Sequence, residues 1–129
     1  MTDRGAAIKG EWSSGPFHIN VNLSMIIFEE DGSIIVFCPA LDVSGYGISE
    51  DEAMKSFSHC LNEFFQYTTH KKTFDKELVR MGWKIKKSKI QKMTPPPMAE
   101  LLQTNENFSR IFNNYSYRKI DQPVAMPSC

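Results

Sequence analysis

Hydrophobic and polar residues alternate along residues 18–29. The odd-numbered residues from Ile19 to Ile27 are all apolar, and the even-numbered residues from His18 to Ser24 are all polar. This period of two predicts a β-strand with one face in the core. Residues 26–28 are apolar without a break, so we expect either a β-bulge or burial of both faces there.

A hairpin and a third strand are predicted to follow. The Asp31-Gly32 pair separates two apolar runs, and both residue types tolerate the positive φ of a tight hairpin turn. The second run predicts a strand over residues 33–38. Residues 40–48 predict a bend and a short third strand, in which Gly45 and Gly47 indicate a bulge or a closely approached backbone.

A helix is predicted to begin at Ser49. Ser49 and Glu52 have the spacing of a capping box, in which each side chain accepts a backbone N–H at the helix start. Apolar residues then recur at helical spacing and predict the buried face. These residues are Ala53, Phe57, Cys60, Leu61 and Phe64.

Shorter elements are predicted farther along the chain. Residues 73–81 predict a short helix that ends at Gly82, and residues 83–87 a strand with a basic outer face that can join the first sheet. Residues 88–97 end in a triproline and predict a stiff spacer. Residues 98–113 predict one amphipathic helix. Residues 115–126 read as an edge strand or an arm, because Pro123 cannot donate to an inner ladder.

This pattern predicts an α+β fold in three segments. Residues 1–16 form an N-terminal leader, and residues 17–92 form an antiparallel βββαβ sheet with one packed helix. Residues 93–129 add a helix and an extended arm that pack on the domain or on another subunit.

Composition narrows the class of protein. The chain has 129 residues, of which 41% are hydrophobic, and 15 basic residues balance 15 acidic ones. These values are typical of one soluble domain without bulk attraction to nucleic acid or membranes. No apolar run is long enough to span a bilayer, and the N-terminus lacks the apolar segment of a signal peptide. Cys38, Cys60 and Cys129 have no CxxC spacing, which favours a reducing cytoplasm.

No arrangement of residues along the chain indicates catalysis, a metal or a cofactor. The histidines lack metal-binding spacing, and the acidic runs 29–31 and 50–52 fit a turn and a helix start. Acids after Gly45-x-Gly47 disfavour a phosphate site. The sequence therefore predicts a protein that is not an enzyme and has no cofactor. A hydrolase with a degraded site, drawing on Glu29, Asp31 and Asp42, is the alternative.

Two segments are candidate binding elements. A basic stretch is either a nucleic-acid patch or an exposed strand face with its linker. Apolar residues in the C-terminal arm indicate that the arm docks on a surface, for example by adding a strand to a sheet edge. The basic residues are Lys84, Lys86, Lys87, Lys89 and Lys92, and the arm residues are Tyr115, Tyr117, Ile120, Val124 and Met126.

Residues 28–65 resemble the HicB-like antitoxin domain. The resemblance rests on Phe28-Glu-Glu-Asp-Gly32, Val36-Phe-Cys-Pro-Ala-Leu41 and Gly47-Ile-Ser-Glu-Asp-Glu-Ala53, in the family's order. It implies a fold similar to a partial ribonuclease H without its catalytic carboxylates. It also implies a bacterial toxin–antitoxin system, a homo-oligomer, and a small HicA-like toxin ribonuclease as partner. Asp42-Val-Ser44 replaces the family's Pro-Gly-Cys, and residues 95–129 resemble neither of its DNA-binding modules.

Overall fold

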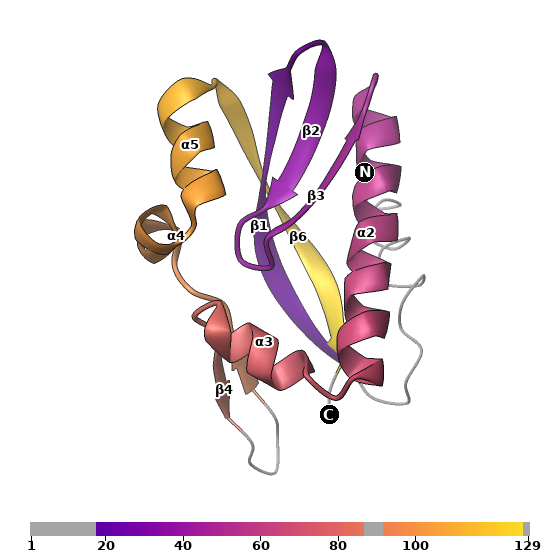
Figure 1. The fold of residues 1–129 in the computed structure, drawn as a ribbon, viewed down its shortest axis with the longest axis vertical. Helices are drawn as coiled ribbons and strands as arrows, with labels where there is room; N and C mark the ends of the chain where they lie inside the picture. Colours follow the sequence, from indigo (N-terminus) through magenta and orange to yellow (C-terminus); the bar gives the residue numbers. More distant parts are fainter. Residues whose placement is uncertain (1–17, 87–91, 128–129) are drawn as a thin grey trace.

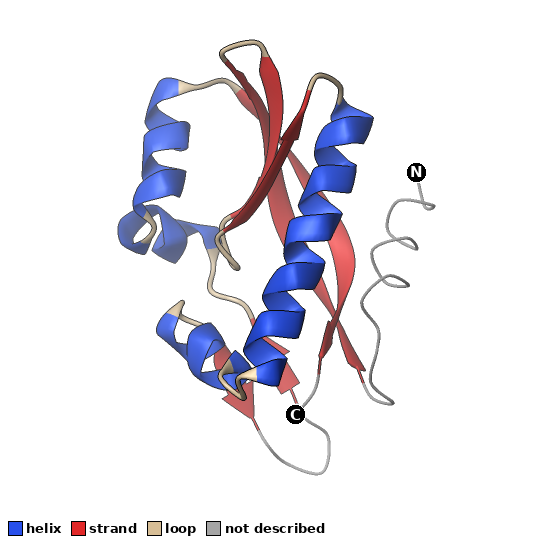
Figure 2. Ribbon diagram, turned by 45° about the vertical axis from the view of Figure 1, so that its right-hand side comes forward, coloured by secondary structure: helices blue, strands red, loops and turns tan. Residues whose placement is uncertain are grey.

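A computed structural model describes residues 18–86 and 92–127 as a mixed α+β fold. An antiparallel sheet with the strand order β3-β2-β1-β6 forms its centre. Helix α2 lies on one face of the sheet, and α4 and α5 lie on the other side (Figure 1; Figure 2). The strands are β1 (His18–Glu30), β2 (Ser33–Cys38), β3 (Val43–Gly47), β4 (Lys84–Lys86), β5 (Lys92–Thr94) and β6 (Tyr117–Pro127), and the helices are α2 (Glu50–His70), α3 (Phe74–Arg80), α4 (Met98–Thr104) and α5 (Glu106–Asn114).

Strand β1 is the centre of the fold, and both of its faces are buried at residues 26–28. Ile26, Ile27 and Phe28 are all at most 7% exposed. The pairing of β1 with β2 and with β6 continues in step through these residues, so there is no bulge. Of the two explanations that the sequence left open, two-sided burial is confirmed.

The hairpin between β1 and β2 has the predicted geometry. Asp31 and Gly32 both have positive φ, at 53° and 82°. Two successive left-handed residues form the turn whose twist matches that of the flanking strands. The Asp-Gly pair therefore sets the register, in which Glu30 faces Ser33.

Strand β3 packs directly on the backbone of α2. A Cβ atom added to Gly45 would lie 2.1 Å from the Phe57 nitrogen, and one added to Gly47 would lie 2.5 Å from Cβ of Glu52. Close approach is thus the reason for both glycines, as one of the two predicted alternatives stated. The Tyr46 N–H donates to Oγ of Ser56 at 3.2 Å, so α2 also satisfies a donor on the free edge of β3.

Helix α2 begins with the predicted capping residues. Oγ of Ser49 accepts the Glu52 N–H at 3.2 Å. Oε1 of Glu52 accepts the N–H of Ile48 at 3.2 Å, one residue earlier than in the usual capping box. The cap therefore fixes the last residues of β3 as well as the helix.

The predicted βββαβ order is wrong in its last strand. Strand β4 does not join the main sheet but pairs with β5 in a separate two-stranded ribbon. The place beside β1 belongs to β6, which pairs with it from His18 to Phe28. The physical reason is length and burial: β4 has three residues, whereas β6 has eleven and buries Val124 and Met126 completely.

The single predicted C-terminal helix is two helices. Asn105 has φ −108° and ψ 108°, outside the helical region, and separates α4 from α5. Its Oδ1 accepts the N–H of Phe108 at 3.0 Å and caps α5. Asparagine side chains compete with the helix backbone in this way. The prediction that Pro123 lies on an edge strand is confirmed, since β6 is one of the two edge strands of the sheet.

Several predictions fall on residues that the structure does not describe. The leader of residues 1–16, Lys87 and Lys89 lie outside the described residues. Within the described ranges, none of the helices combines the length and the apolar character needed to cross a membrane.

Candidate functional site

The two acidic segments lie at the same end of the sheet. Register places Glu29 opposite Ile34, and Ile34 opposite Gly47, so the β1–β2 turn adjoins the β3–α2 junction. The structure thus brings together two runs that are separated by about twenty residues in the sequence. We call this region the acidic end of the sheet.

Some of these carboxylates connect the C-terminal elements to the sheet. Oε2 of Glu30 accepts the Tyr115 hydroxyl at 2.7 Å and lies 3.5 Å from Nη1 of Arg110. Glu50 at the start of α2 pairs with Arg118 of β6. The hydrogen bond to Glu30 raises the pKa of Tyr115, because the phenol proton is held by the carboxylate. These acids therefore have a structural role.

An apolar row crosses the sheet at this end, on the face opposite α2. Strand register places Tyr46, Ile35, Phe28 and Tyr117 side by side on the four strands. Tyr115 covers Phe28, with ring centroids 5.2 Å apart, and the other end of the row is partly open. Tyr46 is 70% exposed, and Ile48 just beyond it is 81% exposed.

The basic stretch is only partly described, and its described part forms one face of a ribbon. Lys86 lies opposite Lys92 and Lys84 opposite Thr94, and all three lysines are exposed. Ile85 and Met93 point the other way, and Met93 is 5% exposed. Within the described ranges, these lysines have no ion pair.

The residues of the predicted interaction arm lie in β6 and just before it. Val124 and Met126 are completely buried in the chain's own sheet. Tyr115 and Ile120 are half-buried, and Tyr117 is 37% exposed. The arm thus adds a strand to the sheet of its own chain. Tyr117 is the residue in this set that is most available to a partner.

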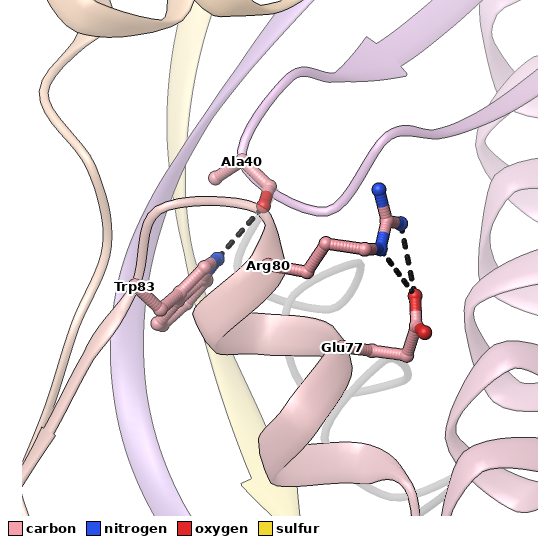
Figure 3. Close-up of polar contacts among 4 residues, drawn as sticks. All are labelled: Ala40, Glu77, Arg80 and Trp83. Atoms are coloured by element: carbon pink, nitrogen blue, oxygen red, sulfur yellow. Dashed lines mark hydrogen bonds and ion pairs between the residues drawn. The ribbon is translucent and has the colours of Figure 1, made fainter.

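A polar cleft of about 370 Å³ lies between the β2–β3 turn, the end of α3 and the α4–α5 junction. Asp42, Glu100 and Arg80 line it. The Arg80 guanidinium is already bonded to Oε1 of Glu77 at 2.9 and 3.1 Å, as Figure 3 shows. The amide of Asn105 donates to Oδ1 of Asp42 at 3.1 Å. Arg80 and Asp42 of this cleft are thus already bonded to other side chains of the protein, as expected where neighbouring elements pack together.

The β2–β3 turn is fixed by two side chains from distant parts of the chain. The Trp83 Nε1–H donates to the Ala40 carbonyl at 2.8 Å (Figure 3), and the Asn105 amide donates to the Pro39 carbonyl at 3.3 Å. Sequence reasoning missed both roles. The position of Asn105, three residues before Phe108 within an amphipathic pattern, could have indicated a helix cap. No sequence feature near Trp83 identifies the carbonyl that accepts its N–H.

We expect Trp83→Phe to lower the free energy of unfolding by about 2 kcal/mol, because the buried Ala40 carbonyl would lose its donor and the smaller ring would leave a void. Trp83 is 3% exposed. Urea denaturation followed by circular dichroism measures the change. Tyr67→Phe is the control, since Tyr67 is 64% exposed, and it should change stability by no more than about 0.5 kcal/mol. Equal effects in the two variants would contradict the role of the indole.

We expect Cys38 to resist alkylation in the folded protein. Burial raises the pKa of its thiol to about 12, so the reactive thiolate is essentially absent at pH 8. Cys60 is half-buried on α2 and should react faster. Peptide mass spectrometry after timed treatment with iodoacetamide at pH 8 measures both. Modification of Cys38 at the rate of Cys60, without urea, would contradict its burial.

Neither a metal-binding cluster in the described ranges nor similarity to a known protein assigns a function to these residues. Within the described ranges, no three His, Cys, Asp or Glu side chains lie close enough together to hold a metal ion. Comparisons with protein-family models, with curated proteins and with solved structures find no match. Any assignment of function therefore rests on the residues and surfaces described above.

Proposed function

We propose that this chain is a non-enzymatic protein of the HicB-like antitoxin type, which binds and occludes a small HicA-like toxin ribonuclease. The observation that carries the proposal is the exposure of Tyr46 and Ile48, at 70% and 81%, within the stretch that resembles the family. Large apolar side chains exposed next to each other are typical of protein–protein interaction sites.

The packing of the resembling stretch supports the same proposal. Its turn, its strand end and its helix start form one unit, in which Gly45 and Gly47 let α2 lie against β3. Within this unit, Glu52 caps the start of α2 and Glu50 forms an ion pair. Such roles are those of a rigid scaffold that presents a surface.

Co-expression tests the proposal. The gene is expressed together with the small basic protein encoded beside it, and growth and co-purification are measured. We expect the neighbouring protein alone to arrest growth, and this chain to restore growth and to co-purify with it. Restored growth without a complex, or no rescue by the wild-type chain, would contradict the proposal.

Nucleic-acid binding through the basic ribbon is the second candidate function. The observation that favours it is that Lys86 lies directly opposite Lys92. Like charges that face each other on two paired strands destabilise the fold. An anionic partner would neutralise these lysines and remove the repulsion between them. A two-stranded ribbon also has the width of the DNA major groove.

Filter binding to duplex DNA and RNA over a range of salt concentrations tests this second function. We expect the variant with Lys84, Lys86 and Lys92 replaced by Gln to bind more weakly, and its salt slope to fall by about one per lysine removed. The same change at Lys55, Lys71 and Lys76, on α2, just after it and on α3, is the control. Absence of binding by the wild-type chain at low salt would exclude the function.

We further propose, from the resemblance, that the chain is a homo-oligomer. The C-terminal half of β6 is a poor surface for adding a strand, because Pro123 and Pro127 have no N–H and lie on the same side of the strand. The half from Tyr117 to Asp121 keeps its donors. Light scattering after gel filtration measures the state, and a monomer at all concentrations would contradict the proposal.

A further inference from the structure

We propose that the toxin docks on the apolar surface formed by Tyr46, Ile48 and Ile35, with Asp31 of the β1–β2 turn at its rim. This inference rests on the proposed function and names the surface that performs it. The occupant is a basic protein surface with an apolar centre.

The surface is the uncovered half of the apolar row. On the β1 and β6 side, Tyr115 packs on Phe28, and Phe112 lies with its ring centroid 6.1 Å from that of Tyr117. On the β2 and β3 side, Ile35 is half-buried and Tyr46 is 70% exposed. Phe112 of α5 and Tyr115 just after it thus cover one half of the row and leave the other to solvent.

The fold does not need these side chains but holds their backbone firmly. The N–H of Tyr46 is bonded to Oγ of Ser56, and the N–H of Ile48 to Oε1 of Glu52, both at 3.2 Å. Two side chains of α2 therefore fix the positions from which Tyr46 and Ile48 project. Groups held in place before binding lose little conformational entropy on association, which is the property expected of binding residues.

The charge at the rim indicates the chemistry of the occupant. Glu30 and Glu50 are compensated by Arg110 and Arg118. Asp31 in the turn is exposed, and its carboxylate has no ion pair or hydrogen bond with any other residue in the described ranges. Glu29 is also exposed, but register places it on the face of the sheet that carries α2. An RNA-cleaving protein needs Lys and Arg to hold phosphates. Such a basic surface would meet the uncompensated carboxylate of Asp31 and be hidden from RNA, whereas RNA itself would be repelled.

Affinity measurements with matched variants test the surface. The probe is the purified small basic protein encoded beside this gene, and the method is biolayer interferometry. We expect Tyr46→Ala with Ile48→Ser to weaken binding about 100-fold, as for central interface residues. The control is Tyr67→Ala with Val79→Ser, which are 64% and 58% exposed. They belong to the end of α2 and to α3, and α3 lies at the end of the molecule away from the β1–β2 turn (Figure 1). The control should change the affinity less than about threefold.

A second pair of variants tests the charge. Asp31→Asn should lower the association rate about threefold at low salt, and the difference should vanish at high salt. Glu29→Gln, on the α2 face of the sheet, is the matched control and should leave the rate unchanged. Asn tolerates the positive φ of residue 31, and melting curves check that each variant keeps its fold.

The outcomes separate this inference from the proposed function. If the wild-type chain binds the probe and the Tyr46 and Ile48 variant binds equally well, the docking surface is wrong and the antitoxin function stands. If the folded wild-type chain does not bind the probe, both fall. If the wild-type chain binds RNA instead of the probe, and the Tyr46 and Ile48 variant loses this RNA binding, the assignment of a protein occupant is overturned.

Discussion

Gly45→Ala is expected to lower the free energy of unfolding by about 4 kcal/mol, near the upper limit of single substitutions. The added Cβ would lie 2.1 Å from the nitrogen and 2.5 Å from the Cα of Phe57. These are backbone atoms in the middle of α2, so the clash cannot be relieved by turning a side chain. The whole helix would have to move away from β3, and Phe57, which is completely buried, would lose its packing. Urea denaturation measures the loss.

Two other alanine substitutions serve as controls. Gly32→Ala has no atom within 4 Å of the new Cβ and suffers only from its positive φ of 82°, so it should cost about 1 to 2 kcal/mol. Ser44→Ala, at the exposed position next to Gly45, should change stability by less than about 0.5 kcal/mol. A Gly45→Ala variant no less stable than Gly32→Ala would show that α2 does not lie against the β3 backbone.

The local elements of this fold could be predicted from the sequence because short-range physics determines them. The Asp31-Gly32 turn follows from residues that tolerate positive φ, and both residues have it. The start of α2 follows from Ser49 and Glu52, which make the cap. In each case the residues that decide the conformation lie within four positions of one another.

The neighbours of β1 and β4 could not be predicted in the same way. Strand order depends on which distant segment buries more surface against β1, and the alternation of β4 does not reveal that eleven residues of β6 compete with it. The break between α4 and α5 is a related case. The apolar spacing from residue 98 to 113 predicts one continuous helix. The break depends on hydrogen bonds from the side chain of Asn105 to Pro39 and Asp42, which lie more than sixty residues away in the sequence.

The candidate surface was only half visible in the sequence. The turn and the helix start that hold the acids were correctly predicted, but Glu30 and Glu50 also reach distant residues. The meeting of the two acidic runs at one end of the sheet is a result of strand register. Tyr46 and Ile48 look like ordinary strand residues, and only the packed structure shows that they remain exposed. Burial is a property of the whole fold, so a binding surface made of apolar residues leaves no local pattern.

The C-terminal segment completes the fold that the resembling stretch begins. The acidic end is held by Arg110 of α5, Tyr115 just after α5 and Arg118 of β6, which reach Glu30 and Glu50. Without β6, the β1 residues from His18 to Phe28 would have an unpaired edge. The proposed docking surface is therefore kept in shape by a part of the chain that does not resemble the family.

Val124→Asp is expected to lower the free energy of unfolding by at least about 3 kcal/mol, because it places an unpaired carboxylate in the core. Val124 is completely buried and lies opposite Val21 of β1. At this cost the variant should expose hydrophobic surface or fail to accumulate in soluble form. Urea denaturation and binding of a hydrophobic dye measure the effect.

The matched control introduces the same charge at the adjacent residue. Pro123 is exposed and faces the other side of β6, so Pro123→Asp should change stability by less than about 1 kcal/mol. The comparison decides whether β6 belongs to its own sheet. If β6 packed only against another subunit, Val124→Asp would change the oligomeric state and leave the stability of the monomer unaltered. A monomer that loses stability at Val124 but not at Pro123 is the result that the burial of Val124 beside the exposed Pro123 requires.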